Sequence, residues 1–312
     1  MENLTGIRDA FGLALLDLGR RDDRIVALAS DSKYSSKLDL FEKEFPDRFF
    51  DVGVCEQNLV GVAGGMAVAG KIPFIAAIAS FMSMRCFEQI RTTLAYQKLN
   101  VKAVGMSAGF AYPQLGATHT CVEDLSIMRA ASNMVVIAPA DNMETYKATL
   151  AIAEYNGPVY MRLGRHPVPD IYGKDYQFVI GKGTQLTDGS HITIIAVGHC
   201  VAYALEANEL LAKDGIEARV INMSSIKPLD EALILKAAKE TGAIVTVEEH
   251  NLAGGLGSAI AEYLIQNYPV RMKFIGIPNE TPPIGPREWQ LKRYGLTPAA
   301  IAASVKEVLV SA

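Results

Sequence analysis

A single acidic residue, Glu56, stands where a predicted strand gives way to a helix rich in glycine and alanine. The residues that follow it, 59–70, include no charged side chain. An acid in that place is removed from water and can hold or donate a proton near neutral pH. The alternative is that Glu56 only caps the helix through the amides of its first turn. On these residues alone, both roles remain open.

Two further segments hold side chains that serve in catalysis and cofactor binding. Phe81 and Phe87 flank Arg85 at the end of a second predicted strand, and an aromatic ring there can stack on a planar heterocycle. The alternative, that a ring belongs to the core, suits Phe87 better. His119 lies in a loop of small residues before a predicted helix, where histidine can transfer protons. A structural role for His119 is the competing interpretation.

Two arginines stand at the end of another predicted strand. Arg162 and Arg165 are separated there by a leucine and a glycine, and paired arginines can bind an anionic group through several hydrogen bonds. Solvent-facing charge is the alternative interpretation. Arg8 and Ser35 are further candidates for the same kind of ligand.

Motifs that the sequence lacks exclude several kinds of binding site. No G-x-G-x-x-G follows a predicted strand, and neither a Walker loop nor a Gly-Asp-Gly sequence occurs. The chain therefore has no recognisable cradle for a diphosphate, and we predict no metal ligands. The net charge of −4, without a basic block, argues against nucleic acid as a partner. The four cysteines are scattered and lack metal-ligand spacing. The sequence also shows no signal peptide and no stretch of about 20 apolar residues. These features predict a cytoplasmic protein.

The elements that must position these residues alternate between apolar strands and helices. This rhythm predicts an α/β fold with mostly parallel sheets covered on both faces. We expect two doubly wound domains, over residues 1–168 and 191–312, joined by a linker at 169–190 that contains a hairpin turn. The expected strands are 25–29, 49–52, 74–79, 101–106, 134–138, 159–163, 192–197, 218–222, 243–248 and 272–277. Helices are expected between them, among them 59–70 and 85–97.

Taken in order, these segments resemble the C-terminal half of transketolase. The matching segments are Gly53–Asn58, Ser80–Arg91, Gly116–His119, Ala138–Asp141, Tyr160–Arg165 and Leu252–Ala259. They extend over nearly the whole chain. The resemblance implies a pyrimidine-binding domain followed by the smaller C-terminal domain of that family, as in the second subunit of a split transketolase.

The resemblance also implies a cofactor. In this family thiamine diphosphate lies between a pyrimidine domain and a diphosphate domain from different chains. The acid that matches Glu56 bonds the aminopyrimidine ring and promotes deprotonation of the thiazolium carbon. Phe81 matches the ring that stacks on the pyrimidine, and Arg85 and Phe87 are expected beside the cofactor.

The same resemblance implies transfer of a two-carbon ketol unit from a ketose to an aldose. His119 matches a histidine at the reacting carbons. Arg162 matches an arginine that binds the substrate phosphate, and Arg8 and Ser35 fall near other phosphate contacts. Two positions depart from the family pattern: Leu115 replaces the usual Asp, and Ser107 replaces a phosphate-binding His. Loss of these polar contacts should alter substrate specificity more than the chemistry.

The diphosphate and Mg²⁺ site belongs to the half of the family that this sequence does not match. Because Met1 stands shortly before the first predicted helix, we expect a natural subunit, inactive alone, that self-associates. We expect a heterotetramer of two such chains with two N-terminal subunits that carry a Gly-Asp-Gly motif.

Three other functions remain as alternatives. The beta subunit of a 2-oxoacid dehydrogenase has similar size and domains, but it would release CO₂ from a 2-oxoacid. A synthase that condenses pyruvate with glyceraldehyde phosphate is normally one long chain. A non-catalytic regulatory or scaffold subunit is disfavoured because Glu56, Phe81 and His119 occur together.

Overall fold

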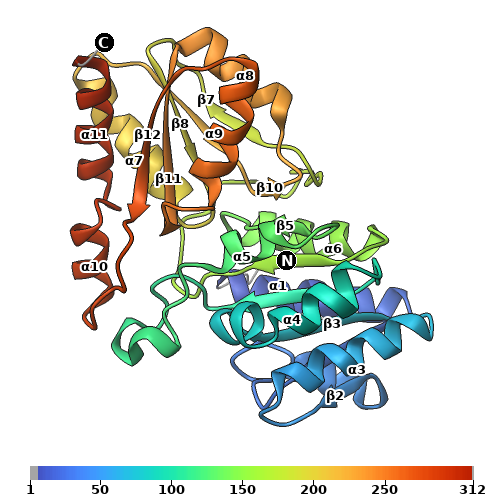
Figure 1. Ribbon diagram of the computed structural model, residues 1–312. Coiled ribbons are helices and arrows are strands. Elements are labelled where there is room, and N and C mark those ends of the chain that lie inside the picture. Colours follow the sequence, from blue (N-terminus) through green and yellow to red (C-terminus); the bar gives the residue numbers. More distant parts are fainter. Residues whose placement is uncertain (1–5, 311–312) are drawn as a thin grey trace.

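Six parallel strands from the first half of the chain form most of a seven-stranded sheet (Figure 1). The computed structural model describes residues 6–310. The six strands are β1 (Ile25–Ala29), β2 (Phe49–Asp51), β3 (Ile72–Ile78), β4 (Lys102–Met106), β5 (Val135–Ile137) and β6 (Val159–Arg162). Because they are parallel, their carboxyl ends lie along one edge of the sheet.

Helices cover both faces of this sheet, as expected for apolar parallel strands. In β1, Ile25 and Ala27 join the core beneath α1, whereas Val26 and Leu28 join the core beneath α3. This alternation follows from the two-residue period of a strand. The helices and helical turns of this half are α1 (Ile7–Arg21), α2 (Asp39–Glu44), η1 (Pro46–Arg48), α3 (Glu56–Val68), η2 (Phe81–Arg85), α4 (Phe87–Gln89), η3 (Ile90–Ala95), η4 (Pro113–Thr118), α5 (Asp124–Ala130) and α6 (Asn142–Glu154).

Two helix predictions need correction. The helix expected over 59–70 begins earlier, so Glu56 is the first residue of α3. The helix expected over 85–97 begins at Phe81, and π-helical turns η2 and η3 stand on either side of the short α4. The wider turns break the 3.6-residue periodicity on which the prediction rested. Such π-helical insertions occur often at functional sites.

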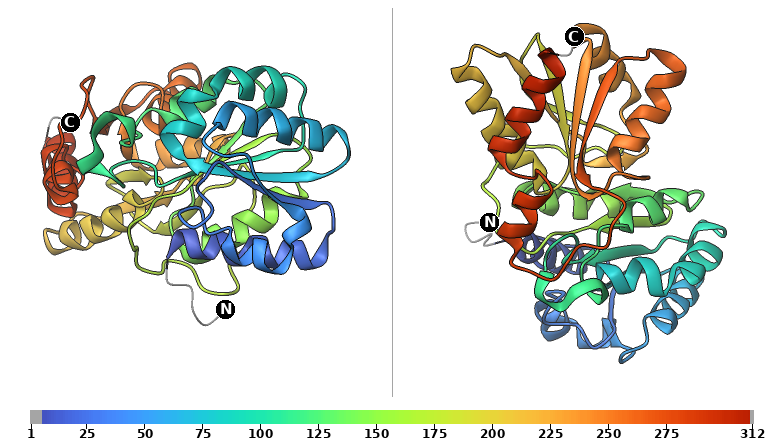
Figure 2. Two further views of the ribbon diagram at one scale, coloured as in Figure 1. Left: turned by 90° about the horizontal axis from the view of Figure 1, so that it is seen from below. Right: turned by 60° about the vertical axis from the view of Figure 1, so that its left-hand side comes forward.

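The second half of the chain forms a five-stranded sheet in the order β12-β11-β8-β9-β7. Its strands are β7 (Thr184–Thr187), β8 (Ile192–Ala196), β9 (Ala218–Asn222), β11 (Ala243–Asn251) and β12 (Arg271–Ile277), and its helices are α7 (Cys200–Lys213), α8 (Glu231–Thr241), α9 (Leu256–Asn267), α10 (Arg287–Arg293) and α11 (Pro298–Val310). Helices α7 and α11 share one apolar core, and both views in Figure 2 show the dark-red α11 beside the gold α7. Strand β7 runs antiparallel to β9 and lies inside 169–190, where we expected only a linker and a turn.

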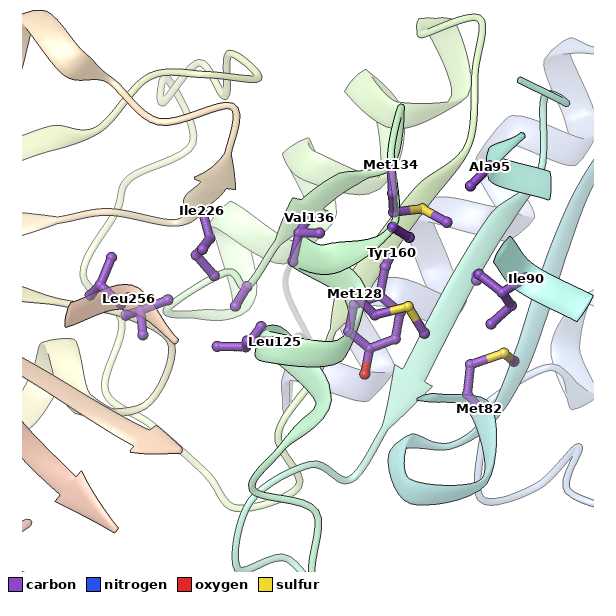
Figure 3. Packing of buried hydrophobic residues seen from close by; sticks show 14 of the residues in the cluster. Met82, Ile90, Ala95, Leu125, Met128, Met134, Val136, Tyr160, Ile226 and Leu256 are labelled. Carbon is purple, nitrogen blue, oxygen red and sulfur yellow. The ribbon is translucent and has the colours of Figure 1, made fainter. Parts of the chain in front are cut away.

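The two domains share structure at their junction. Strand β10 (Ser225–Lys227) comes from the second half of the chain, yet it pairs antiparallel with β5 at the edge of the first sheet. One apolar cluster continues across the junction. Figure 3 shows Ile226 and Leu256 on one side of it, Met82 and Ile90 on the other, and Tyr160 between them.

Within residues 6–310, no helix combines the length and the apolar character that a membrane crossing requires.

Candidate active site

Four loops at the carboxyl edge of the first sheet carry most of the predicted site residues. Glu56 follows β2, Phe81 follows β3, His119 lies in the long loop after β4, and Arg165 follows β6. In open α/β sheets, this edge is where ligands bind. The parallel strands thus bring together residues that are more than a hundred positions apart in the sequence.

Glu56 is buried, with 3% of its surface exposed, and it pairs with Arg85. Nη1 of Arg85 donates a hydrogen bond of 2.8 Å to Oε1 of Glu56. The carboxylate also lies in the first turn of α3, where the helix dipole favours negative charge. The acid that we expected to be isolated therefore has a cationic partner.

A row of aromatic rings extends from Arg85 into the loop after β4. The guanidinium carbon of Arg85 lies 4.0 Å from the centroid of the Phe81 ring. The Phe81 ring meets His119 edge to face at 5.2 Å, and His119 meets Tyr112 at 6.0 Å. Nδ1 of His119 hydrogen-bonds the hydroxyl of Thr118 at 2.8 Å, which fixes the ring. This row joins three of the predicted residues, Arg85, Phe81 and His119.

Two further cations lie at the far end of this row. The guanidinium of the exposed Arg165 lies 4.2 Å from the Tyr112 ring centroid. Nη1 of Arg8 donates to the backbone oxygen of Ser35 at 2.9 Å, so these two residues are neighbours as predicted. Burial lowers the pKa of Arg8, and the nearby charge of Arg165 lowers it further. Arg8 and Arg165 thus both lie beside Tyr112.

Arg162 lies apart from this group, and its contact with a substrate phosphate stays a prediction. Its side chain is 8% exposed, and its Nε donates to both carboxylate oxygens of Asp124, at 3.1 and 3.0 Å. Its Nη2 donates to the backbone oxygens of Cys121 and Glu249. Because Asp124 already balances its charge, the contacts of Arg162 are those of a structural clamp between the first sheet and the domain junction. The sequence carried one signal of this: Arg162 interrupts an otherwise apolar strand.

Phe87 also lies away from the open site. Its ring packs against the apolar cluster that crosses the domain junction, which is the core role weighed above for it. The two departures from the family pattern lie in the loop after β4. Leu115 is half exposed in η4, and Ser107 is buried with a φ of +58°, in the left-handed region.

A buried polar cluster at the domain junction was missed by sequence reasoning. Glu249 pairs with Arg287 at 2.9 Å and accepts a hydrogen bond from the backbone N–H of Phe110. Gly109 permits this, because a Cβ there would lie 2.3 Å from the Glu249 carboxylate. His199 lies beside the cluster, and burial lowers the pKa of its ring to about 4. These residues are far apart in sequence, so only the folded arrangement reveals them.

Glu56 and Phe81 are the residues that could hold an aminopyrimidine ring. A buried carboxylate that can accept an N–H and an aromatic face beside it suit such a ring, and Glu56 and Phe81 provide both. Among residues 6–310, no group of three or more His, Cys, Asp or Glu side chains is arranged to hold a metal.

Comparison with known proteins decides the family. Residues 5–170 match the model of the transketolase pyrimidine-binding domain, and residues 181–301 match the transketolase C-terminal domain. The chain belongs to the transketolase family. The predicted family and the predicted order of its two α/β domains are confirmed.

Full-length relatives of this transketolase-family chain are themselves subunits. An apulose-4-phosphate transketolase subunit of Phocaeicola vulgatus is 42% identical, over 98% of each chain. The 6-deoxy-6-sulfo-D-fructose transketolase subunit SqwH of a Clostridium species is 41% identical, over 97% of this chain and 94% of that protein. A solved structure described as a split gene transketolase, inactive beta4 tetramer, superposes with a TM-score of 0.90 at 44% identity and covers 98% of each chain.

Proposed function

We propose that this protein is the second subunit of a split transketolase, which transfers a two-carbon ketol unit from a ketose to an aldose. The observation that carries the proposal is the continuous row from Glu56 through Phe81 and His119 to Arg165 at one sheet edge. The row has an acid and a ring at one end and cations at the other. It is therefore suited to a cofactor and an anionic sugar lying end to end.

The residues of this chain would divide the work as follows. Glu56 would accept a hydrogen bond from the aminopyrimidine ring of thiamine diphosphate, and Phe81 would lie against that ring. When bound, the cofactor supplies a nucleophilic carbon that carries the ketol unit between sugars. His119, beside Phe81, would hold and move a proton at a sugar hydroxyl.

The cations at the far end of the row favour an anionic substrate. We infer that Arg8 and Arg165, rather than the clamped Arg162, bind the acidic end of the sugar. Arginine suits this role because its planar N–H groups match phosphate and sulfonate oxygens. Two relatives are named for a phosphorylated sugar and a sulfonated sugar.

Activity requires a partner in this proposal. The partner would contribute the Gly-Asp-Gly diphosphate site and its Mg²⁺, since the family domains matched by this chain are the pyrimidine-binding and C-terminal ones. A solved relative is described as an inactive tetramer of β subunits. We infer that this chain likewise self-associates without activity, and that two copies and two partners form the active heterotetramer.

The test is to mix the chain with an N-terminal transketolase subunit, thiamine diphosphate, Mg²⁺, a ketose phosphate and an acceptor aldose, and to measure the aldose released from the ketose phosphate. Glu56→Gln should abolish transfer while circular dichroism and co-elution with the partner stay unchanged. Glu88→Gln, at an exposed acid of the nearby helix α4, is the matched control. Near-full activity of Glu56→Gln would overturn the assignment. Release of CO₂ from a 2-oxoacid would instead favour the dehydrogenase.

A further inference from the structure

Arg85 touches both of the groups that the proposed function reserves for the cofactor ring. One of its N–H groups donates to the Glu56 carboxylate at 2.8 Å. Its guanidinium carbon lies 4.0 Å from the centre of the Phe81 ring, which is the distance of a stacked cation–π contact. A single side chain therefore satisfies the acid and covers the aromatic face.

These two contacts are the ones that an aminopyrimidine would make. A guanidinium is planar and carries N–H donors at its edge, so it resembles the ring in shape and in hydrogen bonding. The Phe81 face that Arg85 covers cannot hold a second planar group at the same time. A ring stacked there would have to displace the arginine.

The surroundings allow Arg85 to leave while Glu56 stays. The Arg85 side chain is 46% exposed, whereas the Glu56 side chain is 4% exposed. Arg85 is the last residue of η2, before the backbone turns at Cys86. Its backbone oxygen accepts a hydrogen bond from Gln57, which can hold the main chain in place as the side chain swings into water.

We propose that Arg85 is a placeholder for the cofactor's pyrimidine ring, paired with Glu56 and stacked on Phe81 in the free subunit and displaced into solvent when the cofactor binds. The proposal rests on the proposed function. It explains how the isolated subunit tolerates a buried carboxylate, since removing the partner of a buried charge is strongly destabilising. It also means that cofactor binding must first break an ion pair.

The test measures thiamine diphosphate binding, not turnover, in the complex with the partner subunit and Mg²⁺. Arg85→Met keeps the length of the side chain but removes the charge and the planar group. We expect the association rate of the cofactor to rise at least threefold, with an unchanged or smaller dissociation constant. In the cofactor-free chain the same variant should melt at a lower temperature, and Glu56→Gln added to it should restore the melting temperature.

Arg91→Met is the matched control, because Arg91 is an exposed arginine of the adjoining turn η3 and its binding kinetics should equal those of the wild type. If Arg85→Met does not fold, Arg85→Lys serves instead: it keeps the charge near Glu56 but uncovers Phe81, and should also speed association. An association rate that is unchanged or slower, or a dissociation constant raised threefold or more, overturns the placeholder.

Failure of the proposed function gives a different pattern. In that case the wild-type complex would show no saturable cofactor binding, and Glu56→Gln would change nothing. A third pattern separates the two proposals. If the wild type binds the cofactor, Glu56→Gln weakens binding at least tenfold, and Arg85→Met slows association, the proposed function is supported and only the placeholder role of Arg85 is refuted.

Discussion

Arg162 of the first domain donates a hydrogen bond of 2.9 Å to the backbone oxygen of Glu249 in the second domain. The same guanidinium balances the buried carboxylate of Asp124, which also accepts from the hydroxyl of Tyr160 at 2.8 Å. Because one arginine serves both the sheet and the domain junction, its loss should affect the fold more than the substrate.

Arg162→Met should therefore destabilise the protein by about 3–5 kcal/mol, the usual cost of leaving a buried partner charge uncompensated. Urea unfolding of the isolated chain would measure this. Adding Asp124→Asn, which removes the stranded charge, should recover part of the loss. A loss below about 1 kcal/mol would contradict the clamp.

Arg165→Met should impair substrate binding and leave stability unchanged, because Arg165 is exposed and stacked on Tyr112. We expect its free energy of unfolding to stay within about 0.5 kcal/mol of the wild type. In the assembled enzyme, the KM for a ketose phosphate should rise about 10- to 100-fold, as expected for a lost charged hydrogen bond. Steady-state kinetics with a neutral ketose provide the control. An equal loss on both sugars would refute the role of Arg165 at the anionic end.

The contrast between these arginines shows where sequence reasoning succeeds. The apolar runs predicted every strand of the first sheet except the edge strand β10, and the resemblance gave the family. Which of the two arginines faces the ligand depends on tertiary context. Arg162 lies within β6 and meets Asp124 in α5, whereas Arg165 lies beyond the strand end. Neither fact is visible in the spacing of the two residues.

Strands β7 and β10 and the π-helical turns were not predicted from the sequence. Strands β7 and β10 have four and three residues, and each is defined by the strand beside it rather than by its own pattern. The π-helical turn η2 changes the direction of Phe81 and Arg85 relative to a regular helix. The pairing of Arg85 with Glu56 follows from that turn, so the sequence suggested the residues but not their contact.

The stability of the protein should fall in acid because of His199. Burial lowers the pKa of its ring to about 4, although the Glu249 charge opposes this. Between the unfolded value near 6.5 and about 4, the unfolded chain therefore binds more protons than the folded chain, and stability decreases as the pH falls. The shift corresponds to a loss of at most about 3 kcal/mol.

Urea unfolding at pH 7 and pH 4.5 would measure this loss. His199→Gln should lose less stability over that interval than the wild type. The matched variant His191→Gln, at an exposed ring, should lose as much as the wild type. Equal slopes for all three proteins would show that His199 is not the titrating group.

Substitution of the two phenylalanines of the η2–α4 segment should have different effects, one on cofactor affinity and the other on stability. Phe81→Leu should raise the dissociation constant of thiamine diphosphate in the assembled enzyme about 3- to 10-fold, the value of one stacking contact. Phe87→Leu should leave cofactor affinity unchanged and cost about 1 kcal/mol of stability, since its ring packs on the core. Calorimetric titration and thermal unfolding of both variants would measure these effects. Similar affinity losses in both would contradict the division.

Strand β10 limits where the gene can be divided to express the first domain alone. A fragment that ends in the connection between the domains would lack Ser225–Lys227 and would leave the edge of β5 unpaired. A free sheet edge with apolar residues on both faces is a template for pairing with other chains. Expression of the first domain alone should therefore yield aggregates, and supplying the second domain in trans should rescue its solubility. We therefore expect that the chain cannot be cut between the two matched family domains, at residues 170–181, without loss of the first sheet's edge.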